Sequence, residues 1–120
     1  MAELGPPSST VEVVWTSAQF VLAAAVLVFA ILLARKYRGP WPVMCVLGGA
    51  LTAYIEPLID VTCQVVWAAH RQPASIAAFG RVVPIWTLGC YAYLMGFSGI
   101  MLWYWNQRGT ITTQKVIALF

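Results

Sequence analysis

Apolar residues fall into three long runs that are separated by short polar links. The runs cover residues 13–34, 41–67 and 82–105. Each run has at least the roughly 20 residues that an α-helix needs to cross the hydrocarbon core of a bilayer. The pattern therefore predicts an all-α fold, an integral membrane bundle of three transmembrane helices.

The segments outside these runs predict two further features. Residues 1–12 are mostly polar and contain two prolines, which is typical of a disordered tail. Residues 110–120 are apolar at positions 116, 117, 119 and 120, which predicts the start of a fourth helix. Because the sequence stops inside that pattern, we expect it to be the N-terminal part of a longer polytopic protein.

Charge is scarce in this chain. Only 9% of the 120 residues are charged and 61% are hydrophobic, whereas soluble domains carry about 25% charged residues. This composition argues against a soluble domain, and we expect the lipid bilayer to be the main partner. No basic run is long enough to follow a phosphate backbone, so we expect no nucleic-acid partner. Three cysteines inside apolar runs give no metal-ligand spacing, and we expect neither a metal nor a cofactor.

Basic residues predict the orientation in the membrane. Five Lys and Arg residues follow the first and third runs, at positions 35, 36, 38, 108 and 115, whereas two lie between the second and third runs. Cytoplasmic links carry an excess of basic residues. We therefore expect the 35–40 link and the C-terminal end in the cytoplasm and the N-terminal tail outside, in a plasma or inner membrane. Tryptophans gather near the ends of the runs, as in interfacial aromatic belts.

Two acidic residues, Glu56 and Asp60, lie inside the second run. Together with Gly48, Thr52 and Gln64 they are spaced by four, which places them on one slowly drifting helix face. An ionised acid near the bilayer centre costs about 2.5–3.5 kcal/mol, and two like charges one turn apart repel each other. We therefore expect at least one carboxyl group to be protonated at neutral pH. Glu56 and Asp60 are the predicted catalytic acid and base.

Pro57 follows Glu56 directly and has no backbone N–H to bond the carbonyl group of Ala53. We expect a kink in the helix at this point, beside the two acids. Intramembrane acids can also act only as bonds between helices, and this structural role is an alternative to catalysis.

The third run supplies a packing partner for the acidic helix. It contains small residues at a spacing of three and four, Gly89, Ala92, Gly96 and Gly99, and such a stripe lets two helices approach closely. The hydroxyl groups of Tyr91 and Tyr93 in the same run can donate hydrogen bonds toward the acids. With Thr52, Pro57 and Gln64, these tyrosines are the predicted supporting residues of the site.

The blocks GGALTAYIEPLIDV (48–61) and FGRVVPIWTLGCYAYLMG (79–96) resemble the N-terminal part of AveC-like actinobacterial membrane proteins, which are grouped with the spirocyclase of the avermectin pathway. These proteins are polytopic and longer than this chain. Glu56-Pro57, followed by Asp60, is similar to the family's acid–proline step in an early span. The resemblance covers about residues 45–105. It implies closure of a spiroketal from a dihydroxyketone and dehydration of the product, which is acid–base chemistry without metal or nucleotide.

Three functions remain open at this point. The first is a membrane-embedded acid–base enzyme of the cyclase or dehydratase type, acting on an apolar lipid, polyketide or isoprenoid. The second is a transporter or proton-relay subunit, because a kinked span with acids is also typical of transport sites. The third is a non-catalytic membrane subunit. Three spans bury only a small core, so we expect an oligomer or a longer chain in each case.

Overall fold

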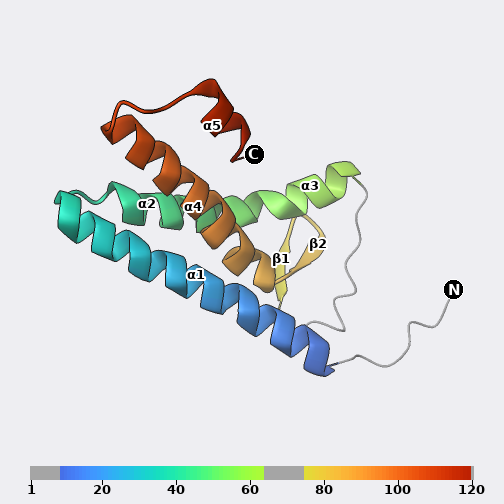
Figure 1. The fold of residues 1–120 in the computed structure, drawn as a ribbon. Helices are drawn as coiled ribbons and strands as arrows, with labels where there is room; N and C mark the ends of the chain where they lie inside the picture. Colours follow the sequence, from blue (N-terminus) through green and yellow to red (C-terminus); the bar gives the residue numbers. More distant parts are fainter. Residues whose placement is uncertain (1–8, 64–74, 120) are drawn as a thin grey trace, which may run out of the picture.

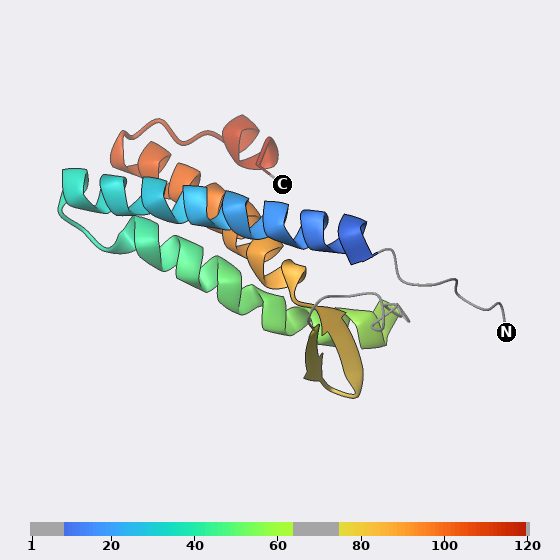
Figure 2. The ribbon, with the colours of Figure 1, turned by 90° about the horizontal axis from the view of Figure 1, so that it is seen from below.

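The computed structural model describes residues 9–63 and 75–119, most of which are helical. The elements in chain order are α1 (Ser9–Tyr37), α2 (Trp41–Thr52), the 3-10 helix η1 (Ala53–Ile55), α3 (Glu56–Cys63), the strands β1 (Ser75–Ala78) and β2 (Arg81–Pro84), α4 (Trp86–Gln107) and the short α5 (Thr113–Ile117). The α2–η1–α3 segment runs beside α1, and α4 packs against both α1 and α2 (Figures 1 and 2). The prediction of a mostly helical chain is confirmed, with a small two-stranded sheet in addition.

Glycines allow α4 to approach both neighbouring helices closely. A Cβ atom on Gly49 of α2 would lie 2.7 Å from the backbone nitrogen of Gly96, which is closer than real Cβ contacts. A Cβ atom on Gly89 would lie 3.1 Å from the backbone carbonyl group of Gln19 on α1. Gly99 packs against Cys45 of α2 in the same way. This confirms the predicted role of the small-residue stripe, because only residues without a bulky side chain permit these crossings.

Large apolar side chains point mainly away from the bundle. The buried apolar cluster consists of Ala30, Val46, Ala92 and Ile100, and two of these four are alanines. In contrast, Val21, Leu32 and Leu51 are more than half exposed. Only 11% of the most apolar stretch of α1 is buried. The bundle therefore exposes many large apolar side chains around a small buried cluster.

Among the described residues, two helical stretches are long and apolar enough to cross a membrane. They are Thr10–Tyr37, with a mean hydropathy of 2.5, and Trp41–Cys63, with a mean hydropathy of 1.5. α4 is not one of them, since its tryptophans, tyrosines and glycines have low hydropathy. Three transmembrane helices thus remain a prediction, of which two have the required length and composition.

Aromatic contacts join α1 and α4 at both ends. Near the start of the two helices, the rings of Trp15 and Trp86 meet edge to face at 6.0 Å between centroids. Near their ends, the Tyr37 ring meets that of Trp103 at 5.3 Å. The two helices therefore run in the same direction, and α2–η1–α3 runs back along α1 in the opposite direction (Figure 2).

The predicted start of the third helix at residue 82 is wrong. Residues 81–84 form β2, which pairs antiparallel with β1 in the register Ser75↔Pro84 to Ala78↔Arg81, and α4 begins only at Trp86. The connecting residues Phe79 and Gly80 have φ values of 52° and 72°, and this pair of positive φ angles defines a two-residue hairpin turn. Most such turns carry asparagine or aspartate at the first position, so the Phe-Gly pair gave no hairpin signal.

Three other boundaries also differ from the prediction. The disordered tail was predicted to reach residue 12, but α1 begins at Ser9, and residues 1–8 lie outside the described part of the chain. The second predicted span, 41–67, is helical to Cys63 but is interrupted by η1, and its last four residues are not described. In the predicted fourth helix, 110–120, only Thr113–Ile117 is helical, and the Thr112 hydroxyl group caps it by accepting from the N–H of Lys115.

Candidate functional site

The predicted polar face of the second span is only partly buried. Gly48 is exposed, Thr52 and Glu56 are half-buried, and Asp60 has just 1% of its surface exposed. A step of four residues turns a helix by about 40° more than one full turn, so a series spaced by four drifts around the axis. The drift carries the series from the outer surface at Gly48 to the interior at Asp60. The buried positions follow Val46, Gly49, Ala53, Pro57 and Asp60 instead.

A side-chain hydrogen bond joins Glu56 to the neighbouring helix. The hydroxyl group of Tyr91 on α4 donates to Oε2 of Glu56, and both residues are half-buried. The close crossing at Gly49 makes this contact possible, since a Cβ atom there would lie 2.8 Å from the Tyr91 backbone carbonyl oxygen. The glycine thus sets the distance between the helices that carry the acid and its hydroxyl partner.

The helix irregularity predicted at Pro57 lies directly before Glu56, where η1 separates α2 from α3. The backbone N–H of Glu56 donates to the carbonyl group of Ala53, three residues earlier. This 3-10 bond supplies the Ala53 carbonyl group with the donor that Pro57 lacks. The predicted kink thus corresponds to one tighter 3-10 turn within a continuous helical stretch, in which the Ala53 carbonyl group keeps a hydrogen bond.

The remaining predicted supporting residues do not join the acids in the described hydrogen bonds. The Thr52 hydroxyl group donates to the carbonyl oxygen of Gly49 at 2.6 Å, a bond within its own helix. The Tyr93 hydroxyl group accepts a long hydrogen bond of 4.0 Å from the thiol of Cys90, also on its own helix. Gln64 lies outside the described residues. The cluster that the structure brings together is therefore Glu56 with Tyr91, and Asp60 one turn further along α3.

One buried polar residue was not predicted to belong to a site. Gln19 of α1 is 2% exposed, and its Oε1 atom has no hydrogen-bond partner among the described residues. The Thr16 hydroxyl group, one turn earlier, is also buried and finds no partner in that part of the chain. The sequence did contain a signal for this buried polar position, since Gln19 is the most polar residue of an otherwise apolar run.

We expect Gln19→Met to leave the free energy of unfolding unchanged or to raise it by about 1 kcal/mol. Methionine has a similar volume, and it removes a buried acceptor that has no donor. Unfolding in a detergent mixture, followed by circular dichroism, measures the change, and Thr16→Val is the matched variant. A loss of stability of more than about 1 kcal/mol in Gln19→Met would show that the amide is bonded in the folded protein.

The described residues hold no group of three His, Cys, Asp or Glu side chains that is close enough to bind a metal ion. Glu56, Asp60 and Tyr91 offer oxygen atoms that can transfer protons or form hydrogen bonds. Comparisons with protein-family models, with curated proteins and with solved structures find no match. The function must therefore be inferred from the residues of this chain.

Proposed function

We propose that the chain is an integral membrane protein with three membrane-spanning helical segments: α1, α2–η1–α3 and α4. The apolar outer surface of the bundle supports this proposal, because in water it would be a large exposed patch. α4 has 22 residues, about 33 Å of helix, and none of them is charged. Its aromatic contacts with both ends of α1 support a similar depth in the membrane for the two helices.

Cysteine labelling tests whether α4 crosses the membrane. We expect Ser75→Cys to react with a membrane-impermeant maleimide from the outside, and Gln107→Cys to react only after the membrane is opened. Both variants replace exposed, uncharged residues in a background in which the native cysteines Cys45, Cys63 and Cys90 are changed to alanine. Labelling of both positions from the same side would mean that α4 does not span the bilayer.

We further propose that the bundle is an acid–base enzyme that acts on an apolar substrate. The observation that carries this proposal is the bond between Glu56 and Tyr91, with buried Asp60 one helical turn away. Two carboxyl groups in an apolar environment are suited to hold one proton between them, so that one acts as acid while the other acts as base. Half-buried Glu56 is the group that meets the substrate, and enclosed Asp60 is the group that exchanges the proton with it.

Closure of a spiroketal from a dihydroxyketone is the reaction we propose, and it suits such a pair. In each step a substrate hydroxyl oxygen forms a bond to the carbonyl carbon, and the base accepts the hydroxyl proton. The acid protonates first the carbonyl oxygen and then the resulting hydroxyl group, which leaves as water. The net change is the loss of one water molecule, with no change in oxidation state. A long apolar polyketide, lipid or isoprenoid carrying this group reaches the site from the bilayer.

The test uses the full chain reconstituted in liposomes with a synthetic apolar dihydroxyketone. We expect mass spectrometry to detect a product that is lighter by one water molecule and that forms faster than in protein-free liposomes. Equal rates in both preparations would count against this reaction. A parallel incubation with the monomethyl ether of the same dihydroxyketone is the matched substrate control, because it cannot close both rings.

A non-catalytic membrane subunit is the second candidate. The Glu56–Tyr91 bond favours it, because that bond also links two neighbouring helices. The two candidates differ in what a glutamine at position 56 does. A glutamine keeps a hydrogen-bond acceptor for Tyr91 but releases no proton, so it preserves a structural bond and removes an acid.

A further inference from the structure

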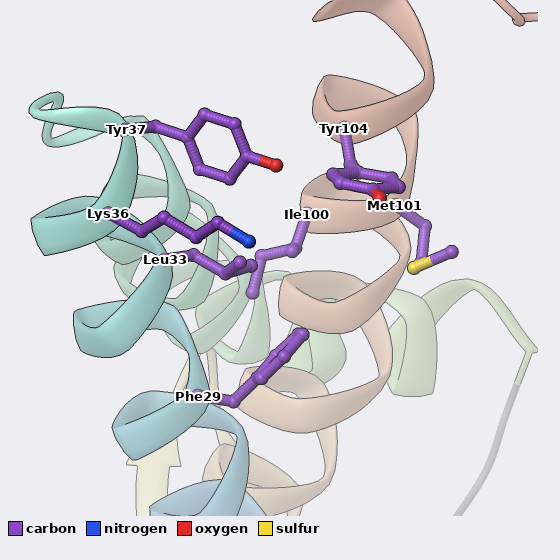
Figure 3. A pocket seen from close by; sticks show the side chains of 7 residues that line it. All are labelled: Phe29, Leu33, Lys36, Tyr37, Ile100, Met101 and Tyr104. Carbon is purple, nitrogen blue, oxygen red and sulfur yellow. The ribbon is translucent and has the colours of Figure 1, made fainter. Parts of the chain in front are cut away.

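A second candidate site, with an apolar wall and a charged rim, lies at the opposite end of the bundle from Asp60. It is a cavity of about 230 Å³ between the last turns of α1 and α4. Its apolar wall is formed by Phe29, Leu33, Ile100 and Met101 (Figure 3). This volume is below the roughly 300–1,000 Å³ of pockets that enclose a drug-sized ligand. The cavity therefore has room for only one part of a drug-sized or larger molecule.

The rim of this cavity is positively charged and carries hydroxyl groups. Lys36 extends from α1 toward α4 between Leu33 and Tyr37 (Figure 3). Tyr37 and Tyr104 complete the rim, and the Arg108 guanidinium group lies 4.6 Å from the centroid of the Tyr104 ring. A phosphate group at this rim would meet an ammonium group, a guanidinium group and hydroxyl donors.

The acids that the structure describes lie far from this rim. Glu12 is in the first turn of α1, about 36 Å from Lys36 along the helix axis. Glu56 and Asp60 lie beyond α2, about 22 Å or more from the start of that helix. Together with exposed Arg35, this leaves a surplus of positive charge at one end of the bundle.

We propose that this cavity binds an anionic phospholipid, with one acyl chain against the apolar wall and the phosphate group at Lys36 and Arg108. Charge complementarity selects the headgroup, and the partial enclosure suits a chain that continues into the bilayer. Basic pockets between helices on the cytoplasmic side are typical binding sites for anionic headgroups. The proposal rests on the proposed membrane insertion but is independent of the acid–base chemistry, and cysteine labelling of Ser75 and Gln107 tests insertion separately.

Native mass spectrometry of the full chain in neutral detergent tests the proposal. Dioleoylphosphatidylglycerol and dioleoylphosphatidylcholine are added in equal amounts, and the adducts that remain bound are compared. We expect one phosphatidylglycerol to be retained in preference to phosphatidylcholine. Lys36→Gln is expected to weaken this binding about fivefold, the usual contribution of one basic residue at an anionic surface. Glycerol 3-phosphate is expected not to displace the lipid, since it lacks the acyl chain.

Arg35→Gln is the matched control, because Arg35 lies in the same last turn of α1 but does not line the cavity. We expect it to retain wild-type lipid binding. Met101→Trp fills the cavity and leaves the charge intact, and it is expected to lose the bound phosphatidylglycerol. Equal retention of both lipids by wild type, or equal losses in Arg35→Gln and Lys36→Gln, would overturn the proposal. Displacement by glycerol 3-phosphate would show a phosphate site without a lipid.

Discussion

Gly49→Ala is expected to destabilise the bundle by about 1–3 kcal/mol or more, whereas Gly48→Ala is expected to be neutral or stabilising. The added Cβ atom at Gly49 would lie 2.7 Å from the Gly96 nitrogen and 2.8 Å from the Tyr91 carbonyl oxygen. Both are backbone atoms, so no side chain can rotate away and the two helices must separate. At Gly48 no atom of residues 9–63 or 75–119 lies within 4 Å of the added atom.

The two variants form a matched pair, because they add the same methyl group to adjacent residues of α2. Unfolding in detergent, followed by circular dichroism, measures the difference between them. Separation of the helices also moves Tyr91 away from Glu56, so Gly49→Ala is expected to lose activity as well. Equal stabilities for the two variants would show that α2 and α4 do not cross at Gly49.

Glu56→Gln is the second change with a large expected effect. We expect the turnover rate to fall by a factor of about 10²–10⁴, the usual contribution of a positioned acid or base. We expect the free energy of unfolding to stay close to that of wild type, because the amide oxygen still accepts the Tyr91 hydroxyl group. The dihydroxyketone assay and detergent unfolding measure the two quantities on the same preparation.

Thr62→Val is the control, because it also removes a polar group from α3. The Thr62 hydroxyl group is exposed and donates to the carbonyl group of Ile59. It is expected to retain full activity. Tyr91→Phe removes the interhelical hydrogen bond but leaves both acids, and it is expected to lower activity less than Glu56→Gln does. Unchanged turnover in Glu56→Gln would assign the acid a purely structural role and favour the non-catalytic subunit.

The helices were predictable from the sequence because long, mainly apolar runs leave the backbone few alternatives to helical hydrogen bonds in an apolar environment. The stripe of Gly89, Ala92 and Gly96 likewise predicted a close crossing. The hairpin was not predictable, because Phe79 takes a positive φ angle that its side chain does not favour. Proline is compatible both with the first turn of a helix and with the end of a strand, so Pro84 did not distinguish a helix from a strand at this position.

The candidate site was predicted less completely than the fold. A spacing of four residues placed Glu56 and Asp60 on the same helix, but the segments that pack against that helix, β2 among them, determine how deeply each acid is buried. Tyr91 and Tyr93 were equivalent in the sequence, and only the crossing at Gly49 brings Tyr91 to Glu56. The cavity at Lys36 depends on side chains from two distant segments, so no local pattern indicated it.

The central claim is that Glu56 and Asp60 hold a transferable proton inside the membrane, and infrared spectroscopy of the protein in lipid nanodiscs tests it most directly. The chain has only four acidic residues, so a carboxyl band can be assigned by substitution. We predict a protonated carboxyl band at neutral pH that shifts in D2O and is lost or displaced in Glu56→Gln and Asp60→Asn. A spectrum that shows both carboxyl groups fully ionised at neutral pH would contradict the claim.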